Sequence, residues 1–162
     1  KIGCPIFKQT NPDSDFNRRC RGLQETLKQA GIDLELFFIP AEREFDGSAF
    51  SEALELFAEQ GVTAISCLSD KMAMNIYAQA TSHGMKIPDD FSVIGFDDQY
   101  YAQYTCPPLT TVKYPSEALG IRLAGVFNDH LTKLAEKEQC INEVIKPILI
   151  KRQSVRNLTK EQ

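Results

Sequence analysis

The sequence predicts an α/β fold in which helices cover both faces of an open parallel sheet. Strand-sized apolar runs alternate strictly with amphipathic helical segments along the 162 residues, and the connections between them are short. This alternation makes consecutive strands parallel neighbours joined by right-handed crossovers. Ligands of such sheets bind just beyond the carboxyl ends of the strands, so we expect a functional site at that edge.

The individual elements follow from apolar spacing and from turn residues. Strands are expected over residues 1–7, 34–39, 62–68, 91–96, 109–112 and 144–150, and helices over residues 16–30, 48–60, 70–83 and 116–135. The strands are short apolar runs bounded by turn residues. The first two helices carry an apolar stripe and stop at Gly31 and Gly61. The third helix stops at Gly84, and Pro115 opens the longest helix at a position that favours proline.

The composition excludes several classes of protein. The chain has 18 Lys and Arg against 22 Asp and Glu, a net charge of −4, and 43% hydrophobic residues, which is typical of a globular domain rather than a disordered chain. A free-standing nucleic-acid-binding module would carry a dense basic face. If DNA is a partner, we therefore expect another segment to contact it. Because the chain begins without Met in a strand-like run, we expect it to be part of a longer protein.

The cysteines and the apolar runs indicate the compartment. Five cysteines are scattered without a CxxC pair or a histidine at ligand spacing, so we expect free thiols in a reducing cytoplasm and no metal or other cofactor. Cys4 and Cys67 lie in apolar runs and are interpreted as buried. No apolar stretch is long enough to span a membrane and no signal peptide opens the chain, so we expect no membrane partner.

Motifs for catalysis and for nucleotide binding are missing from the sequence. Neither GxGxxG nor GxxxxGK[ST] occurs, so the usual phosphate cradles are missing. We interpret His83 and His130 as helix-surface residues because neither has a nucleophile elbow nearby. The pair Asp97 and Asp98 with Lys113 is similar to the acidic pocket of phosphoacceptor receiver domains. In those domains, however, the acidic pair follows the first strand, whereas here it lies late in the chain, one loop before the lysine. We therefore expect no enzyme activity.

A binding site is the remaining interpretation. Carboxylates at strand ends that face an arginine at the start of a helix suit polyols, because adjacent hydroxyls bond to both groups. Arg19, Asp70 and Asp97 are the candidates. Two alternatives stay open: Arg19 could belong to a solvated helix face with Arg18 and Arg21, and Asp70 could be the N-cap of its helix.

Three tyrosines follow the acidic pair. Tyr100, Tyr101 and Tyr104 could stack on a sugar face or cover the edge of the sheet, and covering is the favoured interpretation.

Residues 69–120 contain a distinctive series of short motifs: an acidic residue followed by Met-Ala, a strand followed by GFDD, and then Pro-Leu-Thr-Thr. The residues that form the series are Asp70, Met72, Ala73, Gly84, Pro88, Gly95, Phe96, Asp97, Asp98, Pro108, Leu109, Thr110 and Thr111. This series resembles the effector-binding region of the lactose/galactose-repressor family of bacterial transcription regulators. Residues 18–32 are similar to the arginine-led first helix of the family, and residues 148–154 to its terminal strand with the R-x-S ending.

The resemblance implies a periplasmic-binding-protein-like fold of type I. In this family the domain has two lobes, and this chain would be a partial two-lobed domain. Residues 1–114 would form the C-terminal lobe, residues 115–140 a crossover helix that belongs with the other lobe, residues 141–154 a returning strand and residues 155–162 a tail. The regulator would be a homodimer, and a missing N-terminal helix-turn-helix would bind operator DNA.

The resemblance also implies the site. Arg19 and Asp97 match the arginine and the strand-end carboxylate that hold the effector in this family. Ser69 stands where many sugar-binding members have Asn, and Tyr114 replaces a polar residue. With Asp70, these residues are the expected effector site, and the effector is expected to be a small carbohydrate or sugar phosphate.

Two further expectations complete the interpretation. The alternative function is a periplasmic sugar-binding protein of an uptake system, which has the same two-lobed fold. The free cysteines, the PPLTT string and the R-x-S ending favour the regulator.

The long helix carries apolar residues on one face at Leu119, Leu123, Val126, Phe127, Leu131 and Leu134. Because such a patch is costly in water, we expect the helix to project from the sheet and to associate with a second copy.

Overall fold

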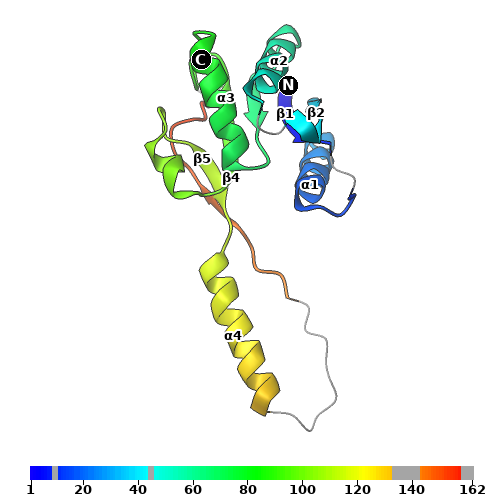
Figure 1. Cartoon of the computed structure of the whole chain (residues 1–162), viewed down its shortest axis with the longest axis vertical. Coiled ribbons are helices and arrows are strands. Elements are labelled where there is room, and N and C mark those ends of the chain that lie inside the picture. The colour runs from blue at the N-terminus through cyan, green and yellow to red at the C-terminus, as the bar shows by residue number, and fades with distance from the viewer. Residues whose placement is uncertain (9–10, 44–45, 133–142, 158–162) are drawn as a thin grey trace.

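A six-stranded sheet with the order β2-β1-β3-β4-β5-β6 organises the protein (Figure 1). The computed structural model describes residues 1–8, 11–43, 46–132 and 143–157. The strands are β1 (Ile2–Phe7), β2 (Leu34–Ile39), β3 (Ala64–Ser66), β4 (Ser92–Asp97), β5 (Thr110–Lys113) and β6 (Ile148–Ile150). The helices are α1 (Asp15–Gln29), α2 (Gly47–Glu59), α3 (Asp70–Ser82) and α4 (Ser116–Thr132), with 3-10 turns η1 (Ala41–Arg43) and η2 (Tyr100–Tyr104). The predicted α/β class is confirmed.

The first five strands are parallel, as predicted, but β6 runs antiparallel to β5, with Thr111 opposite Ile150 and Lys113 opposite Ile148. The chain leaves the sheet at the carboxyl end of β5 and returns to the same end, so β6 must run in the opposite direction. The strand is also shorter than the predicted 144–150, since Val144 lies outside it and is 88% exposed.

The strand order places the helices on two faces. The chain moves from β1 outward to β2 and then reverses to β3, and right-handed crossovers therefore place α1 on the face opposite α2 and α3. Much of the core lies between the sheet and helices α2 and α3, and Phe50, Leu54 and Phe57 of α2 are buried in it. A Cβ at Gly3 of β1 would lie 2.9 Å from the Phe57 ring, so glycine is needed for this close packing.

The chain beyond β6 is fastened to the sheet by buried polar groups. The Arg152 guanidinium lies 2.7 Å from the Asp98 carboxylate, and the two side chains are only 18% and 13% exposed. Arg152 also donates to the carbonyl of Leu109. The Ser154 hydroxyl donates to the carbonyl of Val93 and accepts from the backbone N–H of Thr110. The R-x-S ending therefore has a structural role in joining β6 to β4 and β5.

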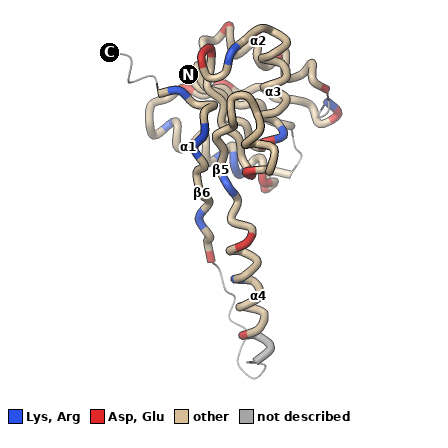
Figure 2. The backbone as a smooth tube through the Cα atoms, turned by 90° about the vertical axis from the view of Figure 1, so that its left-hand side faces the viewer, with Lys and Arg blue, Asp and Glu red and all other residues tan. Residues whose placement is uncertain are grey.

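Helix α4 extends away from the sheet, with the returning chain beside it (Figures 1 and 2). Leu123 and Phe127 on its apolar face are 59% and 67% exposed. Of the same predicted face, Leu131 and Leu134 lie outside the residues whose side chains are described. Arg122 on α4 pairs with Glu143 of the returning chain. The helix projects as predicted.

No helix within the described ranges combines the length and apolar character that a membrane span requires.

The ion pair between Arg152 and Asp98 should contribute strongly to stability. We predict that Arg152→Met lowers the free energy of unfolding by about 3 kcal/mol, because it leaves a largely buried carboxylate without its partner. Urea denaturation measures this loss. Arg43→Met is the matched control, since Arg43 pairs with Asp46 and Glu52 at the surface. An equal loss in both variants would contradict the role of the buried pair.

The exposed face of α4 should cause self-association. We predict that the unaltered chain forms dimers or larger species at micromolar concentration, because a large apolar patch exposed to water favours contact with another apolar surface. The double variant Leu123→Lys/Phe127→Lys should be monomeric by light scattering. Ala118→Lys/Asn128→Lys, which places two lysines at exposed positions on the side of the helix away from Leu123 and Phe127, should still associate. A monomeric unaltered chain would disprove this prediction.

Candidate functional site

A pocket of about 590 Å³ lies at the edge of the sheet where the parallel strands end. Helix α1 contributes Asp15, Arg18 and Arg19, and β4 contributes Phe96 and Asp97. Tyr114, just after β5, and Ser116, the first residue of α4, complete this part of the wall. The pocket is therefore at the edge that the topology predicts.

Arg19 is held in a fixed orientation in this pocket. Its Nη1 donates to the carbonyl of Leu68 at 2.7 Å and lies 3.3 Å from Asp97 Oδ1. Its guanidinium carbon is 3.9 Å from the centre of the Phe96 ring, a cation–π contact. The alternative of a solvated helix face is wrong for Arg19, whereas Arg18 and Arg21 are exposed. The Leu68 carbonyl after β3 and the Phe96 ring of β4 thus hold the guanidinium beside the Asp97 carboxylate.

Asp97 is the last residue of β4 and is partly shielded from water, with its side chain 28% exposed. Burial raises the pKa of this carboxyl above its ordinary value, the charge of Arg19 lowers it, and the charge of Asp70 raises it further. The carboxylate keeps exposed surface in the pocket, so it can accept hydrogen bonds from a ligand.

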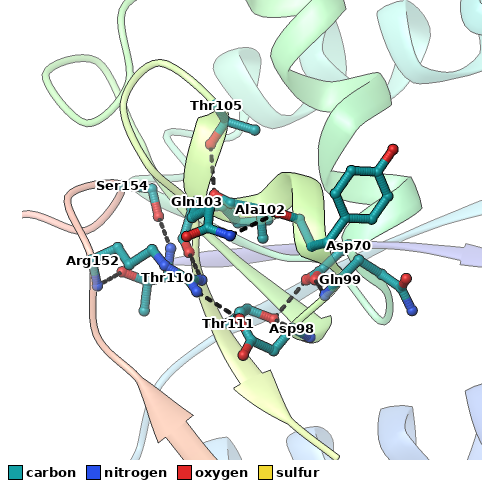
Figure 3. A network of polar contacts seen from close by, with 12 residues as sticks. Asp70, Asp98, Gln99, Ala102, Gln103, Thr105, Thr110, Thr111, Arg152 and Ser154 are labelled. Atoms are coloured by element: carbon teal, nitrogen blue, oxygen red, sulfur yellow. Dashed lines mark hydrogen bonds and ion pairs between the residues drawn. The ribbon is translucent and has the colours of Figure 1, made fainter.

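A network of polar contacts joins Asp70 of α3 to Gln99, which follows β4, and to Thr111 of β5 (Figure 3). The Asp70 carboxylate is fully buried; its Oδ1 accepts from the hydroxyl of Thr111 at 2.6 Å and its Oδ2 from the N–H of Gln99 at 2.7 Å. Burial raises the pKa of Asp70, and these two hydrogen bonds oppose that shift. A Cβ at Gly95 would overlap Asp70 Oδ1, so the carboxylate fits only because β4 has a glycine there.

The structure brings three of the five predicted site residues together. Arg19, Asp97 and the half-exposed Tyr114 line the pocket, whereas Ser69 and Asp70 do not. The Ser69 hydroxyl accepts from the N–H of Met72 and is the N-cap of α3. The interpretation of Asp70 as that N-cap is therefore wrong, because Asp70 is the first residue inside the helix and its carboxylate faces β4 and β5.

The tyrosines after the acidic pair are not in the pocket. Tyr100 and Tyr104 on η2 are 78% and 76% exposed. The favoured interpretation that they cover the edge of the sheet is wrong for these two residues, because η2 turns their rings into solvent. Tyr101 is less exposed and contacts Tyr100 edge to face, with 5.5 Å between ring centres.

Sequence reasoning missed several residues of the pocket wall. Asp15 lies one helical turn before Arg19, so helical spacing could have found it. Phe96 could not have been found in this way, because alternation along a strand places neighbouring side chains on opposite faces. Asp97 has φ of 115°, which ends the alternation and brings both residues to one pocket.

The remaining candidates for chemistry have structural surroundings. His83 is at the C-cap of α3, where its ring contacts the carbonyl of Gln79 at 2.8 Å, as its interpretation as a helix-surface residue requires; the side chain of His130 lies outside the described part. Cys4 and Cys67 are buried, as predicted. Among the described residues, no group of three or more His, Cys, Asp or Glu side chains is placed to hold a metal ion.

Comparisons with known proteins connect this pocket to a family. Residues 1–155 match the periplasmic binding protein-like domain family. The HTH-type transcriptional repressor PurR of Erwinia tasmaniensis is 35% identical over 139 residues, which are 85% of this chain and 40% of that protein. The chain thus spans less than half the length of this curated relative.

Solved structures give the same result. Transcription regulator CcpA of Lactococcus lactis superimposes with a TM-score of 0.71 at 26% identity, over 96% of this chain and 56% of that one. A LacI family regulator from Enterococcus faecium, solved with bound ribose, has the same fold, with a TM-score of 0.74 at 22% identity over 95% of this chain and 56% of that one. The chain belongs to the periplasmic binding protein-like domain family, and the relatives it is similar to are named as transcriptional repressors and LacI family regulators.

Proposed function

We propose that the chain is the effector-binding lobe of a transcription regulator and that it binds a small polar molecule with adjacent hydroxyl groups, a sugar or sugar phosphate. The observation that carries the proposal is the Arg19–Asp97 pair, whose carboxylate and guanidinium lie 3.3 Å apart and both line the pocket. A guanidinium donates and a carboxylate accepts, so neighbouring hydroxyls can bond to both.

The aromatic residues of the pocket support a sugar-like ligand. Phe96 stacks on Arg19 from one side, and Tyr114 is 48% exposed at the end of β5. Rings at the wall of a polar pocket can pack against the C–H groups of a sugar while the hydroxyls bond to Arg19 and Asp97. These groups suit ligand binding. A regulator is favoured over a periplasmic uptake protein because the relatives are named as repressors.

The whole protein would contain a second lobe. The exposed apolar face of α4 supports the assignment of residues 115–140 to that lobe and of residues 141–154 to the return to this one; residues 133–142 of these ranges lie outside the described part of the chain. Operator DNA would be contacted by an N-terminal helix-turn-helix outside this chain, which agrees with the net charge of −4. We further propose a homodimeric regulator located in the cytoplasm, with no catalytic step.

Binding can be tested on the chain itself. We titrate D-ribose, cellobiose and ribose 5-phosphate into the ¹⁵N-labelled chain and follow the backbone amides by NMR. We expect at least one compound to shift Arg19, Asp97 and Tyr114 at millimolar concentration, since one lobe supplies one wall of the site. Asp97→Ala should cost about 2–5 kcal/mol of binding, because it leaves the Arg19 charge unpaired.

Asp13→Ala is the control for this titration. It removes an exposed carboxylate, paired with Arg21, that lies near the same end of α1 but outside the pocket. The control should bind as the unaltered chain does. If all three compounds leave the pocket amides unshifted, or if Asp97→Ala binds normally, the proposed site is wrong.

The affinity should depend on pH through Asp97. The pKa of this carboxyl lies above its ordinary value of 3.8, and only the ionised form accepts hydrogen bonds through both oxygens. We therefore predict constant affinity near neutral pH and a loss as the pH falls through this raised pKa, before an ordinary aspartate would protonate. Titrations between pH 7 and pH 4 measure it, and Asp97→Asn should remove this pH dependence.

A further inference from the structure

The backbone that carries Asp97 has an unusual conformation. Asp97 has φ of 115° and the next residue, Asp98, has φ of 53°, both in the left-handed region that favours glycine. Two such residues in succession at the end of β4 need surroundings that hold them there. Because this turn decides where the Asp97 carboxylate points, the groups that hold the turn also set the geometry of the pocket.

Three side chains, from α3, from β5 and from the segment after β6, bond to this turn, which we call the Asp97–Gln99 turn (Figure 3). Asp70 on α3 accepts from the N–H of Gln99 at 2.7 Å. Thr111 on β5 accepts from the N–H of Asp98 at 3.4 Å. Arg152, beyond β6, pairs with the carboxylate of Asp98 at 2.7 Å. Two successive residues of the turn, Asp98 and Gln99, are therefore held by side chains that do not line the pocket.

The hydroxyl of Thr111 connects two of these bonds. It donates its proton to Asp70 Oδ1 at 2.6 Å, which leaves its lone pairs free to accept from the N–H of Asp98. Thr111 and Asp70 are both fully buried, so water does not replace either bond. A carboxylate is required at residue 70 because both of its partners, the hydroxyl and the N–H of Gln99, are donors. An amide at that position would place its own donor against one of them.

We propose that Asp70 and Thr111 are positioning residues, which hold the left-handed Asp97–Gln99 turn and so keep the Asp97 carboxylate beside Arg19. The proposal rests on the proposed function in so far as Asp97 is the ligand-binding carboxylate. Neither residue lines the pocket, and both act through the backbone. Their effect on a ligand is therefore expected to follow the position of Asp97 rather than the overall stability of the fold.

The test compares two substitutions at residue 111 with a control at another buried hydroxyl. Thr111→Val keeps the shape and removes the hydroxyl, whereas Thr111→Ser keeps the hydroxyl. Ser154→Ala removes another fully buried hydroxyl, which bonds to Val93 and Thr110 and not to the turn. Urea denaturation gives the stability of each variant. Binding is measured with the compound among D-ribose, cellobiose and ribose 5-phosphate that shifts the pocket amides.

We expect Thr111→Val to weaken binding roughly tenfold, which corresponds to about 1.4 kcal/mol, and Thr111→Ser to restore it. Ser154→Ala should lose stability and keep its affinity. The proposal is overturned if folded Thr111→Val binds as tightly as the unaltered chain, or if Ser154→Ala weakens binding to the same extent. Asp70→Asn is the second variant and should weaken binding likewise if Thr111→Val does not fold.

A second measurement needs no ligand and so separates this proposal from the proposed function. The ¹³C resonance of the Asp97 carboxyl is followed against pH in each variant. In Thr111→Val the pKa of Asp97 should move toward the ordinary value of an aspartate, because the carboxyl leaves its shielded place beside Arg19; in Thr111→Ser and Ser154→Ala it should stay raised. An unchanged titration in Thr111→Val would disprove the positioning role even if no compound binds.

Discussion

The burial of one carboxylate constrains much of this fold. Asp70 has no exposed surface, and a buried charge is stable only when donors surround it. Those donors come from the chain just after β4 and from β5, so both segments must lie close to the start of α3. Gly95 is needed to leave the space for the carboxylate. The position of the turn that carries Asp97 follows from these requirements.

The parts of the structure that depend on local spacing could be predicted from the sequence. Helix ends at Gly31, Gly61 and Gly84 coincide with positive φ angles, the conformation in which glycine ends a helix. The edge of the sheet that holds Arg19 and Asp97 follows from the alternation of strands and helices. Both residues could be named before any coordinates because each lies next to a recognisable boundary, the start of α1 and the end of β4.

The parts that depend on contacts distant in sequence could not be predicted in this way. Asp70 and Thr111 are 41 residues apart, and only the fold shows that the carboxylate bonds to the hydroxyl rather than to a ligand. Likewise, the pairing of Arg152 with Asp98 joins residues 54 positions apart. The direction of β6 depends on where the chain returns after α4, which no local pattern contains. From the sequence alone, a residue such as Asp70 is a candidate ligand-binding residue, because buried polar groups and ligand-binding groups are of the same residue types.

The turn that carries Asp97 is bonded to both strands at the edge of the sheet nearest to α4. Thr111 of β5, which lies opposite Ile150 of β6, accepts from the N–H of Asp98. Arg152, two residues beyond the end of β6, pairs with the Asp98 carboxylate. β5 leads into α4, and β6 follows α4 in the sequence. The conformation of the turn, and with it the direction of the Asp97 carboxylate, therefore depends on the placement of the two strands that flank α4 in the chain.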